Sequence, residues 1–244
     1  MSTLASVTIY DVYANLPSPG IPGRLFFVST GTNAGNGYYD DGSAWHQIIT
    51  PGGGGGGGGS LVLLAEYTAS SSATLDLTTR NVTGQSGALF QSDYDTYQIE
   101  VVDLVPATST VGCSMVVSTN GGSTWDTGNN YNWASQNFIR STGAYSGSGA
   151  DTKIPLDDGS AQLNNAGAPV PGLTASIRVT NLAGTYMQMA GGGTFPPNYY
   201  GTGYTIGFKS GGFYFGGTGV NAIRIFMSSG NIASGIVRVY GLAK

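Results

Sequence analysis

The sequence predicts an all-β protein with a small N-terminal β-module, a glycine-rich linker and a C-terminal β-sandwich of jelly-roll type. Glycine supplies 41 of the 244 residues, whereas Lys, Arg, Asp and Glu together supply only 9%. Short runs of alternating apolar and polar residues recur along the chain, and no 12-residue stretch has the apolar period of a helix. Because 40% of the residues are apolar and 11% aromatic, wholesale disorder is excluded and folded strands with many turns are expected.

The first 50 residues are expected to form the small module. Residues 6–13 alternate, and residues 24–29 are the next strand candidate. The three prolines of residues 16–23 exclude a helix there. Asp41-Gly42 is a turn signature between two aromatic residues, which predicts a hairpin. Short strands in so small a segment bury little apolar surface, so the module is expected to dock onto another copy or another protein.

A linker is predicted at residues 51–60, where Pro51 precedes eight glycines and Ser60. A flexible tract of this length would span about 15 Å. In a trimer, the glycine segments could instead pack side by side in extended polyproline-II form.

The remaining residues, 61–244, contain about ten strand candidates, which match a two-sheet sandwich of jelly-roll type. The candidates are residues 61–69, 73–79, 95–104, 111–119, 173–182, 185–189, 203–208, 213–215, 221–227 and 232–240. Residues 129–168 are rich in Asn, Ser, Gly and Tyr and are expected to form long loops.

Three strand candidates alternate clearly enough to predict which side chains face the core. These core-facing sets are Tyr97, Ile99 and Val101; Val111, Cys113, Met115 and Val117; and Ile177 and Val179, with Arg178 pointing outward. A turn is also expected at Asn120-Gly121-Gly122, with Trp125 packing over it. Cys113 is expected to be a buried structural thiol.

Charge and hydropathy exclude several partners. The net charge is −4 and the nine basic residues are spread singly, so a nucleic-acid surface is not expected. No run approaches the roughly 18 apolar residues of a membrane helix, and the N-terminus lacks the pattern of a signal peptide. We therefore expect neither membrane insertion nor classical secretion.

Two parts of the chain resemble tailed-bacteriophage fibre and virion-appendage proteins. The segment VYANLPSPGIPGRLFFVSTGTNAGNGYYDDGSAWHQI is similar to a short module of such proteins. The tract from Ser118 to Trp125, the Tyr131-Asn-Trp133 motif and the ending AIRIFMSSGNIASGIVRVYGL resemble their β-sandwich domains. The resemblance implies a homotrimeric structural protein on the tail or capsid surface, attached to other virion proteins through residues 1–50.

Enzymatic chemistry is not expected. Glycan hydrolysis needs paired carboxylates, but Asp40-Asp41 and Asp157-Asp158 each precede a glycine and are typical of turns. The pair Asp93 and Asp95 is less turn-like, but the repeating solenoid of a β-helix depolymerase is missing. With only His46 and Cys113 as nitrogen and sulfur ligands, neither a metal nor a cofactor is predicted.

Aromatic residues in the expected loops are the candidates for binding. Tyr and Trp offer rigid contact area, and the surrounding Asn, Ser and Gly offer adaptable hydrogen bonds. This mixture suits a neutral, hydroxyl-rich host-surface polysaccharide; alternatively, the same residues pack under loops or between subunits, as in a purely structural or decoration protein. The candidate glycan-binding residues are Tyr131, Trp133, Tyr145, Tyr199 and Tyr200.

Overall fold

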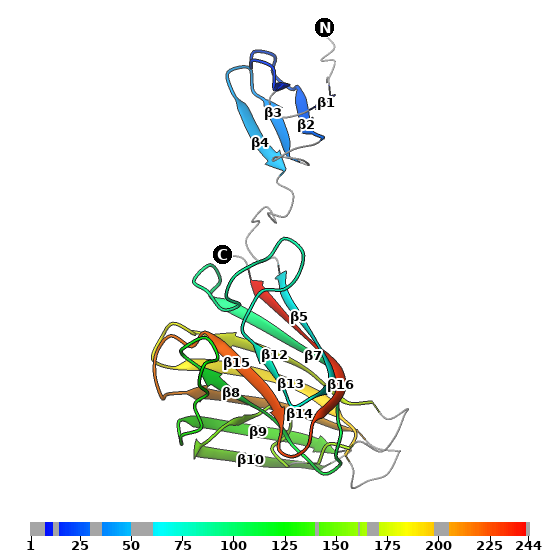
Figure 1. Cartoon of the computed structure of the whole chain (residues 1–244), viewed down its shortest axis with the longest axis vertical. Helices are drawn as coiled ribbons and strands as arrows, with labels where there is room; N and C mark the ends of the chain where they lie inside the picture. The colour runs from blue at the N-terminus through cyan, green and yellow to red at the C-terminus, as the bar shows by residue number, and fades with distance from the viewer. Residues whose placement is uncertain are drawn as a thin grey trace. The chain divides into compact units, whose positions relative to one another are not determined.

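The computed structural model describes residues 8–11, 15–29, 36–49, 61–139, 142–160, 162–164, 171–197 and 205–242. The chain divides into two compact units, residues 1–60 and residues 61–244 (Figure 1). Sixteen strands make up the regular structure of the described residues, so the protein is all-β. No described segment forms a helix that could span a membrane. The predicted linker, residues 51–60, lies outside the described residues.

Unit 1 is a four-stranded sheet with a very small core. Its strands follow chain order, β1 (Thr8–Asp11), β2 (Leu25–Val28), β3 (Gly37–Asp40) and β4 (Trp45–Ile49). The pair β1–β2 is parallel, and the other pairs are antiparallel. The β3–β4 hairpin confirms the turn predicted at Asp41-Gly42, where Gly42 has a φ of +96°. Only Phe26, Val28 and Tyr38 form the described buried apolar cluster of this unit.

The buried carboxylate of Asp40 compensates for this small core. It accepts hydrogen bonds from the backbone N–H groups of Gly20, Ile21 and Gly42 at 2.8–3.1 Å. It also accepts from the Arg24 guanidinium, whose Nε lies 3.0 Å away. Burial alone would raise the pKa of Asp40, but these donors outweigh it and hold the pKa at about 2. The Asp40 side chain thus links the proline-rich segment to the sheet.

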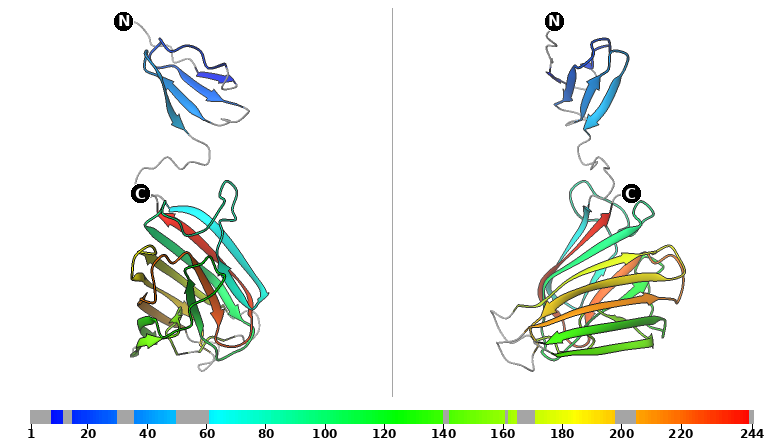
Figure 2. Two further views of the ribbon diagram at one scale, coloured as in Figure 1. Left: turned by 60° about the vertical axis from the view of Figure 1, so that its left-hand side comes forward. Right: turned by 180° about the vertical axis from the view of Figure 1, so that it is seen from behind.

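Unit 2 contains two antiparallel sheets (Figures 1 and 2). The large sheet has the order β10 (Thr142–Asp151), β9 (Tyr131–Ile139), β14 (Ile206–Tyr214), β13 (Met187–Phe195), β12 (Leu173–Thr180), β7 (Thr96–Pro106), β16 (Ile232–Leu242) and β5 (Leu61–Ser72). The small sheet has the order β11 (Ile154–Pro155), β8 (Cys113–Ser118), β15 (Ala222–Met227) and β6 (Thr74–Leu77).

Both sheets contribute to one hydrophobic core. The three predicted core-facing sets are buried, while Arg178 is exposed, which confirms those predictions. Cys113 is fully buried, as predicted, and burial raises the pKa of its thiol well above the usual value. One face of the large sheet packs on this core. The opposite face of the large sheet is called the outer face below.

The expectation of long loops at residues 129–168 is wrong. β9, β10 and β11 all lie in this range. Their sequences show little apolar alternation because many of the side chains are small or polar. In β10, a Cβ atom added to Gly147 would lie 2.9 Å from the carbonyl oxygen of Trp133. Glycine here therefore permits close approach of two strands, a role that periodicity does not reveal.

Candidate functional site

The five predicted binding residues have different environments. Tyr131 is fully buried. Its hydroxyl donates to the carbonyl oxygen of Asp126 at 2.8 Å and accepts from the Val117 N–H at 3.1 Å. Tyr131 therefore belongs to the core and cannot stack on a ligand from this position. Tyr199 and Tyr200 lie outside the described residues.

Trp133 is partly buried and packs within unit 2. Its indole Nε1 donates to the Asp151 carboxylate at 2.8 Å. A Cβ atom on Gly159 would lie 2.6 Å from the Trp133 ring, so the indole lies directly against that glycine. These contacts give Trp133 a packing role at the side of the β9–β10 hairpin.

Tyr145 is the predicted residue that the structure places on the surface. It lies on the edge strand β10 with 79% of its surface exposed. Its register partner on the neighbouring strand β9 is Gln136, whose side-chain amide donates a hydrogen bond to the Tyr145 hydroxyl at 3.1 Å. This bond positions the phenol without covering its ring.

Beside Tyr145, the outer face is nearly free of side chains. Gly147, Ala134, Gly211 and Ala190 are in register across β10, β9, β14 and β13. We call this row the glycine floor. Four strands about 4.8 Å apart give it a length of about 14 Å.

Larger side chains border the glycine floor on both sides. In the next row along the strands, Tyr145, Gln136 and Lys209 face one another and line a hollow of about 290 Å³. On the other side of the glycine floor, two residues further along the strands, Phe213 of β14 and Gln188 of β13 are register partners. Since two residues along a strand span about 6.7 Å, these two rows lie about 13 Å apart.

The second border is aromatic. Phe213, Tyr186 and Phe215 line a hollow of about 580 Å³ together with Gln188 and Gly149. Tyr186 is 52% exposed, and its ring meets that of Phe213 edge-on at 5.9 Å between centroids. These residues are not among the candidates predicted from the sequence, which all come from the expected loops, whereas Phe213 lies within a strand.

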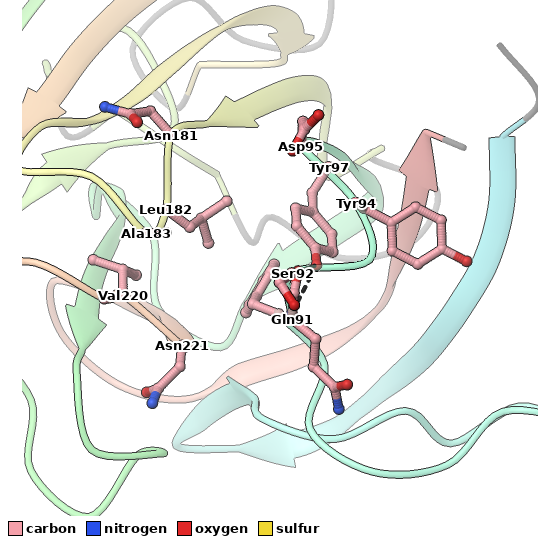
Figure 3. A pocket seen from close by; sticks show the side chains of 12 residues that line it. Gln91, Ser92, Tyr94, Asp95, Tyr97, Asn181, Leu182, Ala183, Val220 and Asn221 are labelled. Carbon is pink, nitrogen blue, oxygen red and sulfur yellow. Dashed lines mark hydrogen bonds between the residues drawn. The ribbon is translucent and has the colours of Figure 1, made fainter. Parts of the chain in front are cut away.

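A third cavity, of about 510 Å³, lies among turns of unit 2 (Figure 3). Leu182, Val220 and Tyr97 form part of its buried apolar wall. The rim amides bond to the protein: Asn221 Nδ2 donates to Thr119 O at 3.2 Å, and Asn181 Nδ2 donates to Tyr186 O at 2.7 Å. Their engagement makes this cavity less suited to a hydroxyl-rich ligand than the outer face.

The described residues contain no cluster of three or more His, Cys, Asp or Glu side chains suited to a metal ion. The adjacent carboxylates Asp157 and Asp158 are nevertheless buried. Asp157 accepts from the N–H groups of Gly159 at 2.7 Å and Cys113 at 2.8 Å. Asp158 accepts from the amide of Asn137 at 2.9 Å. The pair thus joins the turn to β8 and β9, a structural role that agrees with the predicted turn.

This pair predicts an unusual dependence of stability on pH. Burial raises the pKa of Asp157 from 3.8 to about 6, and the nearby Asp158 carboxylate adds to the shift. The folded state therefore binds a proton that the unfolded state releases, and its stability falls as the pH rises from about 4 to above 6. We expect wild-type protein to lose about 3 kcal/mol relative to Asp157→Asn across this window. Urea unfolding at several pH values measures the difference, and parallel curves for the two proteins would contradict it.

Comparison with known proteins gives no match. No family model, no curated protein and no solved structure matches the chain.

Proposed function

We propose that the chain is a non-enzymatic virion protein of a tailed phage or phage-derived particle that binds a host-surface glycan through the outer face of unit 2. The virion assignment rests on the motifs of the N-terminal segment and of residues 118–133. The glycan assignment rests on one observation, the exposed ring of Tyr145 beside the glycine floor.

The glycine floor suits a sugar chain for steric and chemical reasons. Glycine and alanine leave a shallow channel in which a sugar ring can approach the sheet. Tyr145 offers an exposed ring for stacking, and the amide of Gln136 and the ammonium of Lys209 offer hydrogen bonds to hydroxyl groups. Rigid aromatic groups combined with small polar ones are typical of surfaces that bind without large conformational cost.

The proposal includes a jelly-roll-like arrangement of the two sheets and a homotrimer. Unit 1 would attach the chain to other virion proteins, because its three-residue apolar core is small for an independent module. Three copies of a weak glycan site would bind a repeating polysaccharide with much higher avidity, provided that all three engage together.

Replacing Tyr145 with alanine is expected to weaken polysaccharide binding about tenfold, since an aromatic contact of about 1 kcal/mol or more is lost. Affinity electrophoresis in gels containing dextran, mannan or galactan measures the retardation of the full chain. Tyr240→Ala is the matched control. Tyr240 also lies on the outer face, in the same row as Ala190, but β12 and β7 separate it from the glycine floor.

Retardation should change little with moderate salt, because the proposed contacts include no ion pair. Equal retardation of Tyr145→Ala and the unmodified chain would exclude this site. If none of the polymers retards the chain and it does not bind host cells, the adsorption role fails and a purely structural or decoration role is favoured.

A further inference from the structure

The free edges of the sheets in unit 2 differ in how they are protected. β10 and β5 are the edge strands of the large sheet, and β11 and β6 are those of the small sheet. An edge strand presents unpaired N–H and C=O groups, and proteins usually cover, shorten or charge such edges to prevent unwanted pairing.

Three of the four edges have such protection. On β5, the Asn81 side chain accepts from the N–H of Glu66 and donates to its carbonyl oxygen, both at 2.8 Å. The Asn81 N–H also donates to the carbonyl oxygen of Leu64 at 3.2 Å. β6 has four residues, and β11 has two, one of which is Pro155.

β10 lacks these devices. It has ten residues, TGAYSGSGAD, most of them exposed, and contains no proline, lysine or arginine. Its single carboxylate, Asp151, is at the end of the strand and bonds to Trp133. In the described part of unit 2, β9 is its only strand neighbour. Apart from Tyr145 and Asp151, the side chains of this long edge are small and uncharged, which suits it to pairing with another strand.

We propose that β10 pairs antiparallel with β10 of a second copy of this chain, about a twofold axis that passes through the sheet near Ser146. A second copy fits this edge because antiparallel self-pairing is isologous and matches two strands of equal length. Apart from Tyr145, the side chains near the axis are small and allow the two strands to approach closely. This contact uses unit 2 and is separate from the proposed homotrimer, so two homotrimers that pair in this way would form a hexamer.

The pairing would also place the two Tyr145 rings at the shared margin of the two glycine floors. Tyr145 and Gly147 lie on the last strand of the sheet, so the first hollow is open toward the sheet margin. A twofold axis normal to the sheet keeps both outer faces on the same side. Because an axis at Ser146 places position 145 of each copy opposite position 147 of the other, each Tyr145 ring lies at the end of the other copy's glycine floor.

The mass of the full chain in solution tests the proposal, by size-exclusion chromatography with light scattering. We expect an assembly with an even number of 25.0 kDa chains. The double variant A144K/S148K is expected to halve this mass, because an axis at Ser146 places position 144 of each copy opposite position 148 of the other, so that like charges meet. The matched control T68K/S70K places two lysines on exposed positions of β5, which Asn81 protects, and should leave the mass unchanged.

A charge-reversed variant separates repulsion from misfolding. A144E/S148E alone should also have half the mass, and mixing it with A144K/S148K should restore the full assembly through opposite charges. A parent assembly with an odd number of chains, an unchanged mass for the lysine variant, or no recovery on mixing would each overturn the proposal. Binding to dextran, mannan or galactan is scored separately, so failure of the pairing does not decide the glycan function.

Discussion

Asp40→Ala is expected to unfold unit 1 while leaving unit 2 folded. The substitution removes the acceptor of three backbone N–H groups and of the Arg24 guanidinium. Loss of the carboxylate leaves the largely buried guanidinium of Arg24 without its ion-pair partner. The cluster of Phe26, Val28 and Tyr38 offers little apolar burial to compensate.

Hydrogen exchange with mass spectrometry on the full chain measures this effect. Amide protection in β2 and β3 should fall to that of an unfolded segment, whereas β7 and β12 should be unaffected. Asp41→Ala is the matched control, because the Asp41 carboxylate bonds only within the β3–β4 hairpin, to Ser43, to the N–H group of Ala44 and to the ring of His46 at 2.6 Å. Equal loss of protection in both variants would show that the turn, and not the Asp40 network, stabilises the unit.

The same network predicts an acid limit for unit 1. The pKa of Asp40 is lowered from 3.8 to about 2 in the folded state. Its contribution to stability is therefore present above about pH 4 and is lost as the pH falls through about 2.

Gly193→Ala is expected to destabilise unit 2 by about 3 kcal/mol or more, because a methyl group has no room at this position. A Cβ atom on Gly193 would overlap the carbonyl oxygen of Thr174 and lie 2.7 Å from Cα of Ala175. Both atoms belong to the backbone of β12, so the strand itself would have to move. Such a shift would disturb the β12–β13 pairing at the centre of the large sheet.

Gly207→Ala is the control for this substitution. Gly207 also lies in a strand, β14, but a Cβ atom there has no neighbour within 4 Å. Its effect should be near zero or slightly stabilising, since alanine restricts the unfolded chain. Urea unfolding of both variants gives the comparison. A loss below about 1 kcal/mol for Gly193→Ala would mean that β12 and β13 adjust easily to the added methyl group.

The sequence predicted strands best where one face is buried under large apolar side chains. Tyr97, Ile99 and Val101 alternate with polar residues in β7, so their inward direction follows from period two alone. In β10 the residues on both faces are small apart from the outward Tyr145, so no apolar alternation marks the strand. The β9–β10 hairpin depends instead on close backbone approach at Gly147.

The outer-face site was less predictable than the fold. Tyr131 and Trp133 are two residues apart in β9, so they share the inward face of that strand, and aromatic content alone did not separate them from the exposed Tyr145. Lys209 becomes a neighbour of Gln136 only because β14 pairs with β9, about 70 residues away in sequence. Register between distant strands sets this surface, and no local pattern encodes it.

The position of β16 has a consequence for synthesis of the protein. Among the described strands, β5 has only β16 as its sheet neighbour, and β16 also pairs with β7. β5 emerges early from the ribosome but has no strand to join until residues 232–242 have been translated. Its apolar residues Leu64 and Ala65 are fully buried in the folded protein. Until β16 has been synthesised, these residues are exposed to solvent or bound by a chaperone. Unit 2 should therefore fold after translation of β16, and slowly, as expected for pairing between distant segments.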